Sequence, residues 1–369
     1  MALVLPRGES HRLKKMSKPS RARRIAGYSL LALSVACFYV LAFLPTPYVI
    51  EEPGPVFNVL GTTASKPVIT VDGVKTYPTN GNLDVLTVSV RGDRASTPSW
   101  FELAGAWLDP SKAVVPLDEV FPPTQTDSQV QAESTAMMEE SQQDAIAAAL
   151  TNLGYKVPLH VYVSEVMKAS ASAGKLVAAD FILKVNGIAI TDVDQLKTVI
   201  GQQAVKGALT VLVERDGKQV TQQITAVKDD KGAYRLGIMA GTKYDFPVKV
   251  NLQLGNVGGP SGGMMFALGI IDRLTPGQLT GGKNIAGTGT IDMAGNVGPI
   301  GGIRHKLYGA VRNGATIFLA PASNCDEVVG HVPAGITVVK VSKLAEAKAD
   351  LENIANGTNP ASLPTCTAK

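Results

Sequence analysis

The chain has 369 residues, 45% hydrophobic and 18% charged, so it can bury two or three hydrophobic cores and is not disordered as a whole. Its formal net charge of +4 is concentrated before residue 25, which leaves the remainder without the basic surface that nucleic-acid binding needs. Four histidines and three cysteines form no ligand pattern, so we expect no metal and no cofactor.

A transmembrane helix is predicted near the N-terminus. Residues 25–44 form an uninterrupted apolar run of the length that spans a bilayer, and residues 1–24 are rich in lysine and arginine. Because positive charge stays on the cytoplasmic side, residues 1–24 should be a cytoplasmic tail and everything after Pro45 should be extracytoplasmic. A cleaved signal peptide is the alternative, but residues 45–48 offer no small-x-small cleavage site.

Residues 45–130 are predicted to be an extracytoplasmic stem and a β-rich region. Prolines punctuate residues 48–56, which therefore cannot continue the helix. Residues 68–71 and 86–90 alternate as strands do, and the pattern gives these strands no catalytic role.

A further region, 131–237, is predicted to begin with a helix. Residues 133–152 have alanine-rich helical spacing, which stops at Gly154. Strands are predicted at 160–163 and 209–213, on either side of a helix at 193–200.

The stretch from residue 246 to 306 predicts the chemistry. An alternating strand leads into a glycine-rich turn, and Ser261 lies where this turn enters an apolar helix that begins near Gly263. Free backbone N–H groups at a helix N-terminus can stabilise an oxyanion. A glycine-rich stretch of this kind is, by itself, more often only a turn.

A serine nucleophile needs a base, and the sequence offers two. Lys306 lies in the first turn of a predicted helix, where the helix dipole and the neighbouring Arg304 disfavour its charged form, so it can activate a serine. His305 is the alternative, because serine usually works with histidine. No acidic residue near His305 in the sequence suggests an orienting partner.

Two motifs in this stretch resemble those of the Lon-type serine proteases, which use a Ser-Lys dyad. Residues 259–263, Gly-Pro-Ser-Gly-Gly, resemble the family's Gly-Pro-Ser-Ala-Gly. Residues 288–291 and 295–306 follow the family's Thr-Gly-Glu-Ile and Gly-x-Val-x-Pro-Ile-Gly-Gly-Leu-Lys-Glu-Lys, with Thr290 for the glutamate and Arg304-His305 for Lys-Glu.

This resemblance implies a role for each matching residue. Ser261 would be the nucleophile and Lys306 the base, and Thr288 would supply a hydroxyl that orients the lysine. Gly259 and Gly262 would support the nucleophile, with Gly262 standing where the family usually has alanine.

The order of the parts is similar to that of bacterial membrane-anchored Lon-like proteins that carry a PDZ domain. Residues 179–187, Ala-Asp-Phe-Ile-Leu-Lys-Val-Asn-Gly, resemble the PDZ pattern Gly-Asp-x-Ile-x-x-Val-Asn-Gly. A PDZ domain adds an extended peptide to a sheet edge and captures its C-terminal carboxylate with backbone N–H groups. Residues 153–156 are the candidate carboxylate loop, and a plain helix-to-strand turn fits them equally well.

The proteolytic domain is expected at 238–356. Strands at 316–321 and 336–341 and a helix at 344–354 argue for an α+β or α/β layer fold, followed by a flexible tail at 357–369. Cys325 and Cys366 lie on the predicted outer side, where disulfides persist, but the sequence leaves their pairing open.

We therefore expect an α+β chain with an N-terminal transmembrane helix, a β-rich stem region, a PDZ domain and a Lon-type proteolytic domain. No phosphate loop occurs, which indicates an ATP-independent, membrane-anchored serine endopeptidase acting on extracytoplasmic proteins or peptides. The PDZ domain would select or gate substrates, which would lie beside the strand ending at Leu254. The resemblance also implies a homo-oligomer. The alternative is a non-catalytic, peptide-binding scaffold with an idle protease fold; substrate and cleavage preference stay open.

Overall fold

The computed structural model describes residues 21–255 and 257–367. Most of the predicted cytoplasmic tail, residues 1–24, lies outside this range. The chain forms two units: the first contains residues up to Ile50 and Val90–Pro122, and the second contains Glu51–Ser89 and the residues from Pro123 onward.

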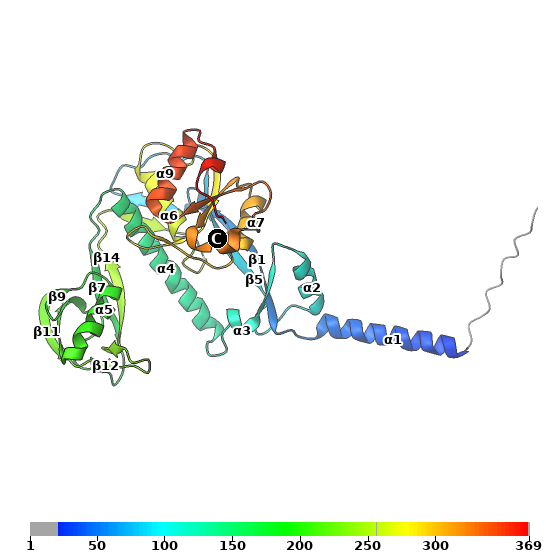
Figure 1. Ribbon diagram of the computed structural model, residues 1–369, viewed down its shortest axis with the longest axis horizontal. Helices are drawn as coiled ribbons and strands as arrows, with labels where there is room; N and C mark the ends of the chain where they lie inside the picture. Colours follow the sequence, from blue (N-terminus) through cyan, green and yellow to red (C-terminus); the bar gives the residue numbers. More distant parts are fainter. Residues whose placement is uncertain (1–20, 256, 368–369) are drawn as a thin grey trace, which may run out of the picture. The chain divides into compact units, whose positions relative to one another are not determined.

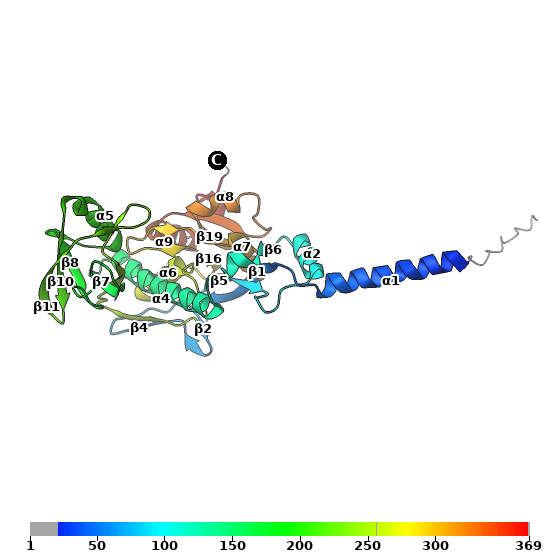
Figure 2. The same cartoon turned by 90° about the horizontal axis from the view of Figure 1, so that it is seen from below.

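The first unit begins with helix α1 (Arg21–Phe43), whose segment Ile25–Phe43 is long and apolar enough to cross a membrane. A signal sequence near an N-terminus would have the same property. Figure 2 shows α1 as one uninterrupted helix, followed in the same unit by α2 (Trp100–Leu108), β6 (Ala113–Pro116) and α3 (Leu117–Val120). The small core of this unit is formed by Ile50, Leu103 and Ala106.

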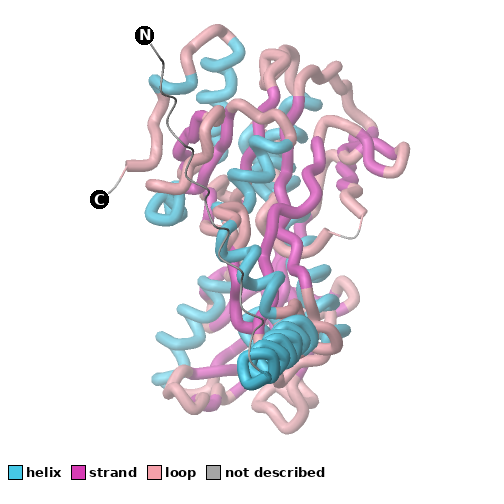
Figure 3. Tube along the Cα trace, turned by 90° about the vertical axis from the view of Figure 1, so that its right-hand side faces the viewer, coloured by secondary structure: helices cyan, strands magenta, loops and turns pink. Residues whose placement is uncertain are grey.

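The main sheet of the second unit is largely parallel. Its strand order is β20-β19-β16-β5-β1. Strands β5, β16, β19 and β20 run parallel to one another. Figure 3 shows the strands of the chain in magenta and its helices in cyan. The bounds are β1 (Tyr48–Asn58), β5 (Asn82–Arg91), β16 (Asn284–Gly287), β19 (Ile317–Pro321) and β20 (Thr337–Val341).

Helices cover both faces of this sheet because its side chains alternate between two cores. Ile285 and Leu319 belong to the core that contains α4 (Asp127–Asn152), α6 (Gly263–Leu274) and α9 (Leu344–Ala355). Ala286 and Phe318, one residue along each strand, belong to the core that contains α7 (Ile303–Arg312) and α8 (Cys325–Val328). The expected mixture of helices and strands is confirmed.

Residues 159–244 form a separate sheet with its own core. All its strand pairs are antiparallel, in the order β11-β10-β8-β7-β14, and β14 is an edge strand. Figure 1 shows this inserted segment in green. Its elements are β7 (Leu159–Val166), β8 (Phe181–Val185), β9 (Ile188–Ala189), α5 (Val193–Gln203), β10 (Leu209–Arg215), β11 (Lys218–Ile224), β12 (Val227–Lys228), β13 (Tyr234–Arg235) and β14 (Ile238–Tyr244).

The structure divides the chain differently from the sequence-based boundaries at residues 130 and 237. Helix α4 packs against α6, because its buried face is rich in small alanines that allow close approach, so it belongs to the core of the main sheet. Strand β4 (Ile69–Asp72), from the predicted stem region, pairs with β15 (Lys249–Leu252). Residues 159–244 are therefore an insertion between α4 and β15.

The ends of the insertion lie side by side. The N–H of Asp245 donates to the carbonyl of Pro158 at 3.0 Å, and the hydroxyl of Tyr244 donates to Asp144 of α4 at 2.6 Å. The insertion thus leaves and re-enters the main body at one place.

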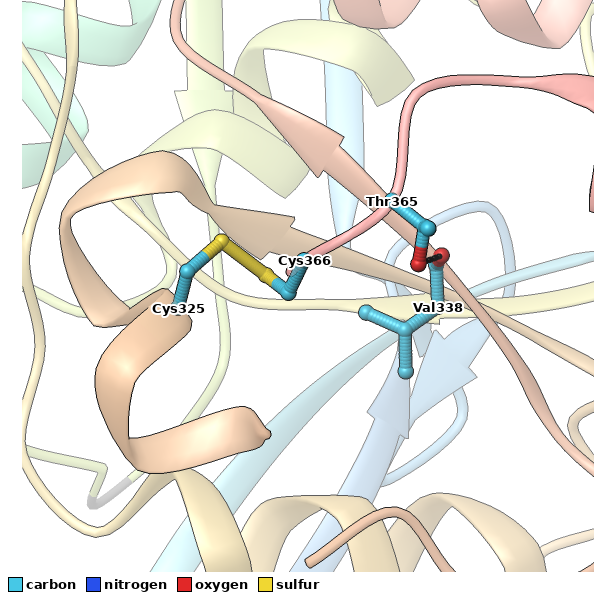
Figure 4. Close-up of a disulfide and its surroundings, with 4 residues drawn as sticks. All are labelled: Cys325, Val338, Thr365 and Cys366. Carbon is cyan, nitrogen blue, oxygen red and sulfur yellow. Dashed lines mark hydrogen bonds between the residues drawn. A yellow bond between two sulfur atoms is a disulfide. The ribbon is translucent and has the colours of Figure 1, made fainter. Parts of the chain in front are cut away.

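The C-terminal tail, predicted to be flexible, is anchored as far as the structure describes it. A disulfide joins Cys325 to Cys366, and the hydroxyl of Thr365 donates to the carbonyl of Val338 at 2.9 Å (Figure 4). The N–H of Lys340 donates to the carbonyl of Pro364 at 2.8 Å. These contacts, made by residues far apart in the sequence, hold the tail along β20.

Candidate active site

Ser261 lies in the loop between β15 and α6, two residues before the helix begins. Gly259 has a φ of +82°, which favours glycine. At Gly262, an added Cβ would lie 3.0 Å from Cε2 of Phe266 and 3.2 Å from Cγ1 of Val85. An alanine here would require these two side chains to shift by a few tenths of an ångström, which favours glycine at this position.

Helix α4 is hydrogen-bonded to this loop. The N–H of Gly259 donates to the carbonyl of Ser134 at 2.9 Å, and the hydroxyl of Ser141 donates to the carbonyl of Pro260 at 2.8 Å. Ser141 is only 4% exposed, so water does not compete for its bond. The backbone on the N-terminal side of Ser261 is therefore fixed by a helix to which no motif assigned a role in the site.

Thr288 links Ser261 to Lys306. Its hydroxyl donates to the carbonyl of Ser261 at 3.0 Å and accepts a hydrogen bond from Nζ of Lys306 at 3.2 Å. The N–H of Gly289 donates to the same carbonyl at 2.8 Å. The structure thus brings together the serine, the threonine and the lysine from three separate elements.

Lys306 is the fourth residue of α7 and is 3% exposed. Burial lowers the pKa of its ammonium to about 8, because the charged form loses its hydration. The sequence-based explanation by Arg304 needs correction: the Arg304 side chain is exposed, and burial is the cause that acts on Lys306.

His305 points to a different partner. Its Nε2 lies 3.4 Å from Oε2 of Glu51, and the imidazole is buried. Glu51 is far away in the sequence, so no local pattern could have indicated this acid. His305 does not line the cavity that contains Ser261.

Ser261 and Lys306 line one cavity of about 540 Å³. Among the described residues of its wall, Lys306 is the only ionisable side chain. No described cluster of three His, Cys, Asp or Glu residues could hold a metal ion. The remaining wall is formed by Pro55, Phe57, Val85, Leu86, Thr87, Val88, Ser89, Met138, Val257, Gly258, Pro260, Gly262 and Gly301.

The strand that borders this cavity is β5. Residues 85–89 line the cavity, whereas β15 pairs with β4 and contributes no lining residue. The pairing of β5 with β16 ends at Val85. An extended peptide beside the serine would therefore meet β5, and the sequence-based choice of the strand ending at Leu254 needs correction.

A second cavity, of about 720 Å³, lies between α5 and the edge strand β14. Leu196 and Ile200 line it from α5, and residues 236–238 line it at the start of β14. The predicted carboxylate loop, 153–156, is absent from this wall, and Gly154 instead closes α4 with a φ of +83°. The sequence Leu-Gly-Ile at 236–238, directly before an alternating strand, could have indicated this groove.

Two protein-family models match this chain. Residues 134–226 match the PDZ domain, and residues 184–351 match the C-terminal proteolytic domain of Lon protease (S16). The chain carries a PDZ domain and a Lon-type proteolytic domain. The proteolytic domain belongs to the serine protease class, and the structure adds β1, β5 and α4 to the part that this match covers.

Curated Lon proteases are similar to part of this chain. Lon protease 2 of Herpetosiphon aurantiacus is 38% identical over 117 residues, covering 30% of this chain and 14% of the relative. Lon protease of Buchnera aphidicola subsp. Acyrthosiphon pisum is 31% identical over 192 residues, covering 49% and 24%. Lon protease 1 of Bacillus subtilis is 28% identical over 185 residues, covering 47% and 23%. The similarity thus spans less than a quarter of each relative's length.

Solved PDZ domains are among the structures to which part of this chain is similar. The PDZ domain of the SdrC-like protein of Listeria innocua is 24% identical, with a TM-score of 0.21, and covers 22% of this chain and 92% of that one. The corresponding domain of Listeria monocytogenes is 25% identical, with a TM-score of 0.21, and covers 22% and 85%.

Proposed function

We propose that the chain is an ATP-independent, membrane-anchored serine endopeptidase that uses Ser261 and Lys306 as a dyad. The observation that carries the proposal is the placement of a buried lysine, the only ionisable group of the described cavity wall, beside a serine at a helix N-terminus. Such a pair has the parts that nucleophilic catalysis requires, a hydroxyl and a base.

In this mechanism, neutral Lys306 accepts the proton of the Ser261 hydroxyl as Oγ attacks the scissile carbonyl. The resulting oxyanion is stabilised by backbone N–H groups around Ser261. Lys306 then returns the proton to the leaving amine, and an acyl-enzyme forms. A water molecule, deprotonated by the same lysine, hydrolyses the acyl-enzyme and regenerates the serine.

The environment of Lys306 supports this role. With a pKa of about 8, roughly one lysine in ten is neutral at pH 7, against fewer than one in a thousand for an ordinary lysine. Thr288 accepts one N–H of Lys306, which leaves the nitrogen lone pair free to face the cavity.

The PDZ domain would present protein substrates to the proteolytic domain. An extended peptide can add to the free edge of β14, and its apolar side chains can enter the groove lined by Leu196 and Ile200. Backbone N–H groups at residues 236–238 would receive a C-terminal carboxylate. This assignment replaces residues 153–156 as the candidate carboxylate loop.

Two features support an extracytoplasmic proteolytic domain. Helix α1 is preceded by a basic segment, and the Cys325–Cys366 disulfide suits an oxidising compartment. Protease added to spheroplasts should therefore degrade the chain beyond residue 50. A proteolytic domain that stays protected until lysis would contradict this orientation.

The catalytic proposal is tested with a fluorophosphonate, a covalent serine-directed probe, on the purified full chain without nucleotide. Labelling should occur in the native protein and be lost in Ser261→Ala. Ser89→Ala is the matched control, because Ser89 is a second hydroxyl in the same cavity wall and its loss should leave labelling intact. A folded native chain that neither reacts nor cleaves an unfolded protein would establish the non-catalytic scaffold instead.

The proposal includes a homo-oligomer, which rests on the family resemblance. Sedimentation of the full chain in detergent measures it. A monomer that cleaves at the full rate would remove oligomerisation from the proposal.

A further inference from the structure

Helix α2 has an exposed apolar face. Phe101 is 44% exposed, Trp107 64% and Leu108 88%, whereas Leu103 and Ala106 are buried in a core with Ile50. Packing of Leu103 and Ala106 within the first unit therefore leaves three large apolar side chains of α2 at the surface.

The helix has almost no polar character to favour water. Its only charged residue is Glu102, which is engaged in the N-terminal cap: Oε2 accepts from the N–H of Ser99 at 2.8 Å and from its hydroxyl at 2.9 Å. A helix that is apolar all round is expected in an apolar environment. The two tryptophans of the chain, Trp100 and Trp107, both lie on α2, and tryptophan is enriched at membrane interfaces.

Helix α2 is fixed beside the C-terminal end of α1. The rings of Phe38 and Phe101 lie 4.9 Å apart, centroid to centroid. The N–H of Thr46 donates to Oγ1 of Thr97 at 3.0 Å, and the Thr46 hydroxyl donates to the carbonyl of Pro98 at 2.8 Å. Figures 1 and 2 show α2 beside the end of α1 and turned across its axis.

The contact with α1 determines how deep α2 would lie in a bilayer that α1 spans. Phe38 precedes the last residue of α1, Phe43, by five positions, which corresponds to about 7.5 Å along the helix axis. Interfacial helices bury their apolar face roughly 5–10 Å into the boundary between headgroups and acyl chains. If α1 spans the bilayer, Phe101 lies at this depth.

We propose that α2 is an interfacial helix, and that its face of Phe101, Trp107 and Leu108 inserts into the bilayer leaflet at the C-terminal end of α1. The partner is lipid, because the surface continues from the apolar surface of α1. The proposal rests on the membrane anchoring of the proposed function. Its consequence is that the chain has two membrane contacts, the spanning helix and a helix lying in the interface.

The tryptophans allow a direct test. In Trp100→Phe, all tryptophan fluorescence comes from Trp107. We expect this emission, from the full chain in phosphatidylcholine and phosphatidylglycerol vesicles, to be blue-shifted and reduced at least twofold by lipids carrying a spin label near the headgroup end of the acyl chain. Trp107→Phe is the matched control: it leaves Trp100, which packs against the core of the first unit and should be quenched less.

Three outcomes separate the alternatives. Flotation of the vesicles after a carbonate wash reports anchoring by α1, so a chain that does not float refutes the anchor. A chain that floats but whose Trp107 emission is unshifted and unquenched has α2 in water, which overturns the interfacial helix alone. Emission that is blue-shifted but not quenched by lipid means that protein covers α2, and this also overturns the proposal.

A substitution provides the second measurement. Leu108→Gln, added to Trp100→Phe in the full chain, changes only an exposed side chain, so α2 should keep its fold, which circular dichroism can verify. This change should reduce the lipid quenching of Trp107 severalfold. Equal quenching with and without the change would contradict the assigned face.

Discussion

The PDZ domain and the proteolytic domain of this chain are built in opposite ways. The PDZ domain is one continuous segment, residues 159–244, with its own core and an open groove at a sheet edge. The proteolytic domain is assembled from segments on both sides of that insertion, and its site depends on contacts between segments more than 100 residues apart, such as Ser141 with Pro260. A binding groove can be local, whereas a dyad that needs a buried lysine requires the whole core.

The comparison predicts the largest effects at the dyad. Ser261→Ala and Lys306→Ala should each lower peptide cleavage by about a thousandfold or more, because the two residues act as one unit. Lys306→Arg should be equally inactive, since a guanidinium stays protonated. The native rate should rise with pH through one ionisation near the Lys306 pKa of about 8. Binding of peptides to the PDZ domain should not change.

His305→Ala is the control for this assignment. It should retain most activity when assayed below its melting temperature. If His305→Ala is inactive while Lys306→Ala still cleaves, the base has been misassigned.

The disulfide should affect only one of the two domains. It closes a loop with a sequence separation of 41, for which chain entropy predicts about 3–4 kcal/mol of stability. The double change Cys325→Ser with Cys366→Ser should therefore lower the unfolding temperature of the proteolytic domain, measured by calorimetry. The unfolding temperature of the PDZ domain should not change. A joint shift of both transitions would show that the two domains unfold as one unit.

Burial of Lys306 should lower the free energy of unfolding. The unfolded chain holds the Lys306 proton up to pH about 10.5, whereas the folded chain releases it near pH 8, so native stability should rise with pH between these values. Below pH 8 the full penalty applies, on the order of 3 kcal/mol for a shift of this size. Lys306→Met should thus be inactive yet more stable than the native chain at pH 7, as measured by urea unfolding. A variant that is less stable at pH 7 would contradict the burial penalty.

Removal of the PDZ domain should leave the dyad working. Because Asp245 and Pro158 are hydrogen-bonded, residues 159–244 can be replaced by a two-glycine linker without stretching the main body. We expect cleavage of an unfolded protein to fall about tenfold and that of a short peptide to stay within twofold. Equal loss on both substrates would assign the insertion a structural or gating role.

The smallest expected effect concerns the support of the nucleophile. Ser141→Ala removes the bond to the Pro260 carbonyl, worth about 1 kcal/mol, and should lower kcat roughly fivefold while KM stays constant. Ser134→Ala is the matched control on the same helix, because Ser134 uses its backbone carbonyl, which alanine retains. An equal loss in both variants would indicate a general defect of α4.

The sequence predicted what is encoded locally. The membrane-length helix, the PDZ pattern and the two Lon motifs are short or periodic, and the presence of the PDZ and Lon-type domains is confirmed. The roles of Ser261, Lys306 and Thr288 stay predictions, now with a geometry that can be tested. The placement of α4 and the partner of His305 could not be predicted, because each depends on residues from distant segments. The sequence analysis did not predict the groove at β14. This strand follows the PDZ pattern at residues 179–187 in the chain, whereas the candidate carboxylate loop, 153–156, precedes it.

The anchored tail has a consequence for the solution behaviour of the protein. Strand β20 is the last strand of its sheet, and the bonds from Lys340 to Pro364 and from Thr365 to Val338 occupy backbone groups on its outer edge. An uncovered edge of this kind is a template on which another chain can add as a strand. Residues 360–367 should therefore protect the folded protein from aggregation, and the Cys325–Cys366 bridge holds this segment in place. A preparation made under reducing conditions, or truncated before residue 360, would expose the edge and should precipitate at concentrations at which the oxidised chain stays dispersed.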